Sequence, residues 1–338
     1  MKRIFNLLIT FFICIVVLFS SCGETNNKIK IALMLPNLTM KRFLKDQAFF
    51  LEEAQKLGCE GIVTDANANE KQQLSQCEEL IKQGVKSIVI AAINSNTGGE
   101  MVRMAKDNGV HVLAYDGIIN NCPLDYLITF DNEKVGTLMA QYAVSKAPYG
   151  DYILIGGDKS NLNAIQIRNG EDKVLAPFIK EGKINVAYAD YTDTWSTEDA
   201  NMIIRKYLRL SGGNKPTAVL GSSDNIAGGV IDAFETEGVD LPITTGQDAS
   251  LESCRSIMMG KQTMTIYKPI KSLAAVAANV AYKLAKGQKI EGVNATTHNG
   301  NYETPTIIID IIAVDKSNME STVIADGFEK KEDIMKQP

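Results

Sequence analysis

The stretch KSIVIAAINSNTGGEMVRMAKDNGVHVLAYDG, residues 86–117, decides the fold class. It opens with an apolar run at 86–93, continues with a helical pattern at 98–108, and closes with a second apolar run at 110–115. Short apolar runs bounded by polar or turn residues are typical of buried strands. Two such strands joined by a helix predict a βαβ unit with parallel strands and a right-handed connection.

The same alternation continues on both sides of this stretch. Upstream, an apolar run at 29–35 precedes a helical pattern at 40–57. Downstream, a second α/β series starts at 126–130, and no Gly/Ser/Pro-rich linker separates it from the first. Because 338 residues exceed what one core usually supports, we expect two lobes joined by short crossing strands that serve as hinges. The predicted N-terminal lobe comprises 29–131 plus 268–293, and the C-terminal lobe 132–267 plus 294–332.

Composition and motifs exclude several functional classes. The net charge of −5 argues against a nucleic-acid-binding surface. The two histidines, His111 and His298, belong to no metal-binding motif, so we expect no metal. No nucleophile elbow or dinucleotide-binding loop is present, so we expect no cofactor and no enzymatic activity.

The N-terminus has the pattern of a bacterial lipoprotein signal. Lys2 and Arg3 precede the apolar run 4–19, and Cys22 follows two serines. This pattern predicts a signal peptide at 1–21, lipidation of Cys22, a polar tether at 22–28, and a periplasmic or cell-surface protein anchored to the membrane by lipid. A cleaved signal without lipid and an N-terminal anchor helix are the alternatives.

The cysteines that follow Cys22 are widely separated and form no C-x-x-C motif. An exported protein can form disulfides, but buried free thiols fit the sequence equally well. Both states stay open for Cys59, Cys77, Cys122 and Cys254.

Three aspartates stand where an apolar strand run gives way to a loop. They are Asp116, Asp224 and Asp248. In open parallel sheets, ligands bind beyond the carboxyl ends of the strands, so these carboxylates indicate a polar small-molecule site. A sugar fits this chemistry, because its edge needs charged or amide partners and its faces need aromatic rings. Further candidates near predicted strand ends or helix starts are Arg42, Phe43, Lys45, Asn163, Arg168 and Trp195.

Several segments resemble one known family in order and spacing. They are AYDGIINN (114–121), ITFDNEKVG (128–136), GGVIDAFETEG (228–238), TGQDAS (245–250) and QTMTIYKPI (262–270). The mature chain is similar to type I periplasmic sugar-binding proteins of the ribose/xylose-binding family, above all to the D-xylose binders of ABC importers. This resemblance implies two Rossmann-like α/β lobes with parallel sheets, joined by three crossing hinge segments, with a sugar in the cleft between them.

The resemblance also assigns roles to individual residues. It implies sugar contacts for Arg42, Asp116, Asn163, Arg168 and Asp248, an aromatic surface from Phe43 and Trp195, and a hinge-side lysine at Lys268. Ser223 and Asp224 complete the predicted sugar-binding set, although Ser223 stands where the family has asparagine and Asp224 could serve only to cap a helix. Gly117 replaces an arginine of the xylose binders, which could change the preferred sugar.

The sequence therefore predicts a monomeric, lipid-anchored binding protein. It captures a monosaccharide, xylose or a relative, and hands it to the membrane permease of an ABC importer. The alternative is a sugar-sensing protein that docks on a membrane sensor kinase or chemoreceptor.

Overall fold

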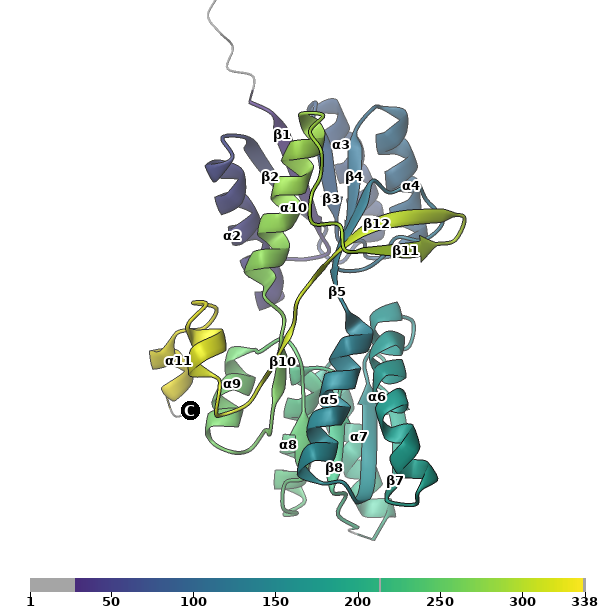
Figure 1. Cartoon of the computed structure of the whole chain (residues 1–338), viewed down its shortest axis with the longest axis vertical. Helices are drawn as coiled ribbons and strands as arrows, with labels where there is room; N and C mark the ends of the chain where they lie inside the picture. The colour runs from purple at the N-terminus through teal and green to yellow at the C-terminus, as the bar shows by residue number, and fades with distance from the viewer. Residues whose placement is uncertain (1–27, 213, 337–338) are drawn as a thin grey trace, which may run out of the picture.

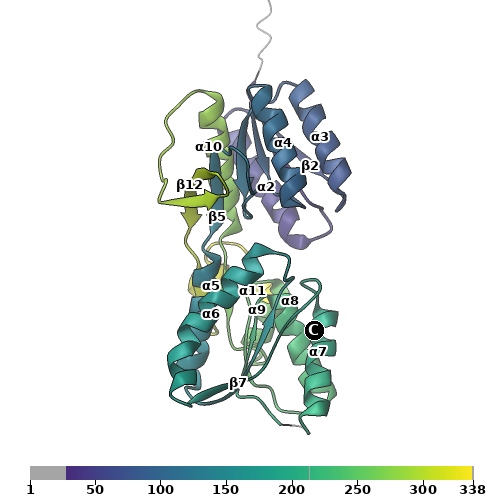
Figure 2. The same ribbon diagram turned by 90° about the vertical axis from the view of Figure 1, so that its right-hand side faces the viewer.

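The computed structural model describes residues 28–212 and 214–336, which form two lobes stacked along the long axis of the molecule (Figure 1). Figure 2 shows the same two lobes from the side. The predicted signal peptide, Cys22 and all but the last residue of the tether lie outside the described residues. Within those two ranges, no helix is long and apolar enough to span a bilayer.

The N-terminal lobe contains a seven-stranded sheet in the order β11-β12-β5-β4-β3-β1-β2. Its first five strands in sequence are parallel where they pair: β1 (Lys30–Leu35), β2 (Glu60–Asp65), β3 (Ser87–Ile90), β4 (His111–Tyr115) and β5 (Tyr126–Phe130). Helices α2 (Lys41–Lys56) and α10 (Ile270–Ala285) cover one face, and α3 (Glu70–Lys82) and α4 (Ser95–Asp107) cover the other.

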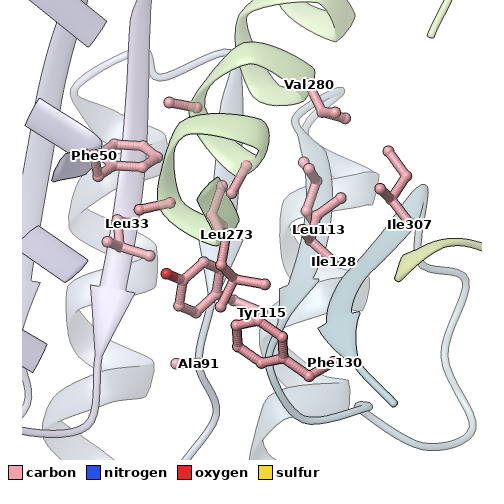
Figure 3. Close-up of a cluster of buried hydrophobic side chains, with 14 of the residues drawn as sticks. Leu33, Phe50, Ala91, Leu113, Tyr115, Ile128, Phe130, Leu273, Val280 and Ile307 are labelled. Atoms are coloured by element: carbon pink, nitrogen blue, oxygen red, sulfur yellow. The ribbon is translucent and has the colours of Figure 1, made fainter. Parts of the chain in front are cut away.

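Strand β1 shows why this sheet needs helices on both faces. Ile31, Leu33 and Leu35 pack into the core beneath α2 and α10, where Figure 3 shows Leu33 near Phe50 and Leu273. The intervening residues Ala32 and Met34 pack into the core beneath α3 and α4. Successive side chains of a strand point to opposite faces, so a continuous apolar run fills two cores.

The βαβ unit predicted from residues 86–117 is confirmed as β3, α4 and β4, with β3 and β4 parallel. Helix α4 begins at Ser95, three residues earlier than expected. The reason is Asn94, whose side chain accepts hydrogen bonds from the backbone N–H groups of Asn96 and Thr97 and caps the helix.

The C-terminal lobe contains a four-stranded parallel sheet in the order β7-β6-β8-β9. The strands are β6 (Gly150–Gly156), β7 (Ile184–Tyr191), β8 (Ala218–Gly221) and β9 (Ile243–Thr245). Helices α5 (Asn132–Lys146) and α6 (Leu162–Lys180) pack on one face, and α7 (Thr197–Leu210) and α8 (Asp224–Thr236) on the other. Helix α9 (Leu251–Met258) belongs to a smaller core beside the crossing strands.

Three segments connect the lobes (Figure 1). The chain passes from β5 to α5, from β10 (Thr265–Tyr267) to α10, and from β12 (Tyr302–Ile309) to β13 (Ile312–Val314). Strands β10 and β13 pair in an antiparallel fashion. These short connections match the crossing segments expected from the sequence.

One predicted domain boundary is wrong. The sequence predicts residues 294–309 in the C-terminal lobe, but β11 (Ala295–Asn299) and β12 extend the N-terminal sheet. Strand β12 pairs in parallel with β5, so that Thr306 lies opposite Leu127, and β11 folds back antiparallel on β12. After β13 the chain forms the π-helical turn η1 (Glu320–Ile324) and α11 (Lys331–Met335), which packs near α9.

The four cysteines Cys59, Cys77, Cys122 and Cys254 are all free and buried. Of the two states that the sequence left open, the structure shows the buried thiols. Burial raises the pKa of Cys77 to about 12, so this thiol stays protonated at neutral pH.

Candidate functional site

Charged side chains from both lobes meet at the ends of their strands. Arg42 lies in the first turn of α2 and Asp116 directly follows β4, and the Arg42 Nη1 to Asp116 Oδ2 distance is 2.9 Å. Asp248 follows β9, and Lys268 follows β10, with 3.5 Å between Lys268 Nζ and Asp248 Oδ1. The predicted residues Arg42, Asp116, Asp248 and Lys268 thus form two ion pairs. We call these four residues the charged cluster.

Both aspartates of the charged cluster have unusual backbone conformations. The φ angle is +65° at Asp116 and +95° at Asp248. Residues other than glycine rarely adopt a positive φ, because this backbone conformation is strained. Strained residues are concentrated at functional sites, where the surrounding fold stabilises them. At Asp116 the backbone is held by hydrogen bonds from its N–H to Ile128 O and from Thr129 Oγ1 to its carbonyl.

Arg42 also faces a second carboxylate, that of Asp46, which was not among the predicted site residues. Asp46 lies one helical turn further along α2, 3.6 Å from Arg42 Nε, and it accepts a hydrogen bond from the Tyr115 hydroxyl. Spacing of four residues places both side chains on one face of the helix, which is the signal that could have found Asp46.

Several polar atoms in this region are buried and have no hydrogen-bond partner among the described residues. They include Arg42 Nε and Nη2, Asp46 Oδ2 and Asp116 Oδ1. Buried polar groups in folded proteins are almost always hydrogen-bonded, so donors and acceptors left open together at a strand end are suited to a polar ligand.

The charged cluster keeps Asp116 ionised. Burial alone raises the pKa of the Asp116 carboxyl, but the opposing positive charges of Arg42 and Lys268 outweigh burial and hold the pKa below its usual range. Asp46 behaves differently, since burial raises its pKa to about 6 against the lowering effect of Arg42. At neutral pH, Asp116 is therefore a charged acceptor.

Asp224 has a different environment although it also follows a strand. Its Oδ2 accepts from the Ser250 N–H at 2.8 Å, and its Oδ1 accepts from Thr265 Oγ1 at 2.8 Å and Gln262 Nε2 at 3.1 Å. Asp224 does not cap helix α8. The N-cap is Ser223, whose Oγ accepts from the Ile226 N–H. Asp224 therefore anchors the loop that carries Asp248 to strand β10.

Burial, followed by the negative charge of Asp248, raises the pKa of Asp224 to about 7. This carboxyl thus takes up a proton near neutral pH, whereas Asp116 does not.

Two predicted site residues have their charged groups occupied by other partners. Arg168 donates from Nε to Glu171 at 3.0 Å and from Nη2 to the carbonyls of Leu154 and Asp190. Lys45 Nζ lies 2.9 Å from Phe328 O and 2.5 Å from Glu329 Oε1. The Lys45 contacts tie α2 to the C-terminal segment.

The predicted aromatic residues come from opposite lobes. Phe43 lies beside Arg42 at the start of α2, and Trp195 precedes α7. Both rings pack against the same hydrophobic core cluster. The indole lies directly on Gly157, where an added Cβ would come within 2.4 Å of three ring atoms, so a side chain at 157 would displace the ring.

A cavity of about 540 Å³ adjoins the charged cluster. Of the predicted site residues, Asp116 and Asn163 line it. Asn132 and Gln166, which the sequence did not predict as site residues, also line it. The signal for Asn132 was its position two residues after β5, beside the crossing to α5.

Comparisons with known proteins agree on the kind of molecule. A family model described as a periplasmic binding protein domain matches residues 31–289. The chain is 41% identical over 317 residues to the D-xylose-binding periplasmic protein of Haemophilus influenzae, covering 94% of this chain and 95% of that protein. It is 38% identical over 333 residues to the D-xylose-binding periplasmic protein of Escherichia coli, covering 98% and 100%.

Comparison with a solved structure indicates the same kind of protein. An ABC transporter solute-binding protein from Clostridium phytofermentans, with β-D-glucose bound, superposes with a TM-score of 0.83. It is 28% identical, and the match covers 90% of this chain and 99% of that one.

Proposed function

The chain belongs to the periplasmic binding protein family, and from that premise we propose that it captures a monosaccharide, xylose or a close relative, and delivers it to the permease of an ABC importer. The predicted family and its type I fold of two α/β lobes are confirmed. Proteins of this family bind solutes and are not enzymes, as the sequence also predicted.

The observation that carries the sugar proposal is the set of unpartnered polar atoms around Arg42 and Asp116. A sugar hydroxyl both donates and accepts, so it can donate to Asp116 Oδ1 while accepting from Arg42 Nη2. Hydrogen bonds to ionised groups are roughly twice as strong as neutral ones, and Asp116 is ionised at neutral pH. A sugar edge therefore satisfies atoms that the folded chain leaves open.

The aromatic residues suit the faces of the same ligand. The C–H groups of a sugar ring pack on flat aromatic surfaces, which Phe43 offers from the N-terminal lobe and Trp195 from the C-terminal lobe. Because these residues and the charged cluster come from both lobes, a bound sugar favours the arrangement in which the lobes close on it. The three crossing segments are the hinges for that movement.

Gly117 bears on which sugar binds. A Cβ at this position would meet no atom within 4 Å, so open space lies beside Asp116. The xylose binders that this chain resembles have an arginine there. The loss of that donor favours a sugar with a different hydroxyl pattern or a larger substituent at this position, each hydrogen bond being worth about 1 kcal/mol.

Calorimetry of the mature protein against a panel of pentoses and hexoses tests the proposal. We expect D-xylose or a related sugar to bind with release of heat, and Arg42→Met to abolish that heat while the protein stays folded. Absence of both heat and a thermal shift with every sugar would contradict the proposal.

We also propose that Cys22 carries lipid and anchors the protein to a membrane. The basic start and the apolar run before Cys22 support this. In cells, Cys22→Ser should move the protein from the membrane fraction to the soluble fraction, as measured by immunoblotting. Unchanged membrane association of the variant would contradict lipid anchoring at this residue.

A further inference from the structure

The cavity of about 540 Å³ extends away from the charged cluster. It shares Asp116 and Asn163 with the predicted sugar site, whereas Arg42, Asp248 and Lys268 do not line it. Its walls come from the segment after β4, from β5, from the first two turns of α5 and α6, and from β11 and β12. In Figure 1 these elements surround the crossing from β5 to α5. The volume lies within the range of pockets that hold whole small-molecule ligands.

The chemistry of the lining suits a neutral ligand that carries hydroxyl groups. Four amide side chains line the cavity: Asn120, Asn132, Asn163 and Gln166. Amides donate and accept together, as hydroxyls require. Apolar side chains that could meet the C–H faces of a ring also contribute: Ile118, Leu127, Phe130 and Ile308.

Apart from Asp116, the charged side chains at the cavity are engaged with other protein groups, and Lys134 lies 3.7 Å from Asp310. Asp131 caps α5 by accepting from the Lys134 N–H, and Glu133 pairs with Lys173 at 2.5 Å. His298 contacts Glu303 at 2.7 Å. The amides, rather than these charges, are therefore the groups available to select a ligand.

One of these amides is buried and only partly satisfied. Asn132 is 4% exposed, and its Nδ2 donates to Gln166 Oε1 at 3.3 Å. Its Oδ1 has no hydrogen-bond partner among the described residues. A buried acceptor without a hydrogen bond costs free energy, so such an acceptor in a cavity wall indicates a ligand that donates a hydrogen bond to it.

We propose that this cavity binds a second sugar unit joined to the captured one, so that the protein accepts a short oligosaccharide such as a disaccharide. The inference rests on the proposed function, because the first ring occupies the charged cluster. The second ring would lie beyond Asp116, with hydroxyls directed at Asn132 and Gln166. Since Ile118 belongs to one lobe and Gln166 to the other, both lobes would contact the second ring when they close.

Calorimetry with D-xylose and its β-1,4-linked disaccharide tests the inference on the full mature chain. We expect the disaccharide to bind at least as tightly as the monosaccharide. Gln166→Leu should weaken disaccharide binding about tenfold, the equivalent of one hydrogen bond, and change xylose binding less than twofold. Asn169→Leu is the matched control, since Asn169 is an exposed amide on the same helix outside the cavity lining.

The outcomes separate the two proposals. Binding of xylose without binding of the disaccharide would overturn the second-unit inference and leave the monosaccharide proposal intact. Equal weakening of both ligands by Gln166→Leu would also overturn the inference, because Gln166 would then act on the sugar site as a whole. If neither ligand nor any other sugar binds, the proposed function itself fails.

Discussion

The two lobes use aspartate in opposite ways. In the N-terminal lobe, Asp116 is flanked by Arg42, stays charged at neutral pH, and leaves one oxygen without a partner. In the C-terminal lobe, Asp224 accepts three hydrogen bonds from its own chain, and burial with the nearby charge of Asp248 raises its pKa to about 7. Both residues follow a strand, so position alone does not distinguish a charged carboxylate with an open oxygen from one whose oxygens are bound by its own chain.

The difference comes from partners that are distant in sequence. Arg42 on α2 pairs with Asp116 after β4, and Thr265 on the crossing strand β10 donates a hydrogen bond to Asp224. A carboxylate held by cations keeps its charge and can bind a ligand, whereas one held by neutral donors serves the fold. Four predictions test this contrast.

The largest effect is expected from Asp224→Ala. The change leaves the Ser250 N–H, the Thr265 hydroxyl and the Gln262 amide without their acceptor in a buried site. We expect the free energy of unfolding to fall by roughly 3 kcal/mol, as measured by urea denaturation. Asp240→Ala is the control, since the side chain of Asp240 in the same lobe is 92% exposed, and it should change stability by less than about 0.5 kcal/mol. A loss as small as that of the control would show that Asp224 is not an anchor.

Asp116→Ala should act on binding. If Asp116 contacts the sugar as proposed, loss of this charged acceptor should weaken affinity about 100-fold, which corresponds to about 2.7 kcal/mol. Calorimetry with the best sugar of the panel measures the change. Asp310→Ala, at a side chain that is 98% exposed, should leave affinity unaltered. Retention of full affinity by Asp116→Ala would remove this residue from the sugar site.

The raised pKa of Asp224 predicts that stability falls as pH rises from about 4 to 7. In the unfolded chain this carboxyl ionises near pH 3.8, whereas in the folded chain it holds its proton up to about pH 7. The folded state therefore binds more protons in this window, and its stabilisation, complete below pH 3.8, is lost as pH approaches 7. Asp46 and Glu171, with pKa values raised by burial to about 6 and 7, act in the same direction.

Urea denaturation at a series of pH values measures this dependence. Asp224 alone should make the free energy of unfolding on the order of 2 kcal/mol higher at pH 5 than at pH 8. Asp224→Asn should remove this share of the difference, since an amide does not titrate, while Asp46 and Glu171 keep theirs. The lowered pKa of Asp116 contributes in the opposite sense, but only below about pH 4, where its stabilisation is lost on protonation. A wild-type curve that rises from pH 5 to pH 8 would contradict the assignment.

The sequence was sufficient to predict the elements and the strand-end positions of the site, because both depend on local patterns. Apolar runs buried on two faces, such as β1, are recognisable from composition and length. Strand β11 was not predicted because its polar sequence ATTHN has no apolar run, although it ends in the buried Asn299. The pairing of β12 with β5 was not predicted because the paired residues, such as Thr306 and Leu127, are far apart in the chain.

Contacts between distant parts of the chain also limit prediction of the site. The sequence predicts Lys45 and Arg168 as sugar ligands, and in the structure both bind groups from distant parts of the chain. Glu329 at the C-terminal end binds Lys45, and two carbonyls on neighbouring strands bind Arg168. Only the folded structure brings these groups together.

The smallest effect is expected from Lys45→Met. The ammonium group is bound by Phe328 O and Glu329, and it lies 3.6 Å from the centroid of the Phe328 ring. It therefore joins α2 to the C-terminal segment, and we expect its removal to change sugar affinity less than threefold, or about 0.7 kcal/mol. Arg42→Met, three residues earlier on the same helix, provides the contrast, because it should abolish binding. If Lys45→Met instead weakens affinity tenfold or more without loss of stability, Lys45 leaves Glu329 to contact the sugar when the lobes close, and the wall around Asp116 contains a second cationic ligand.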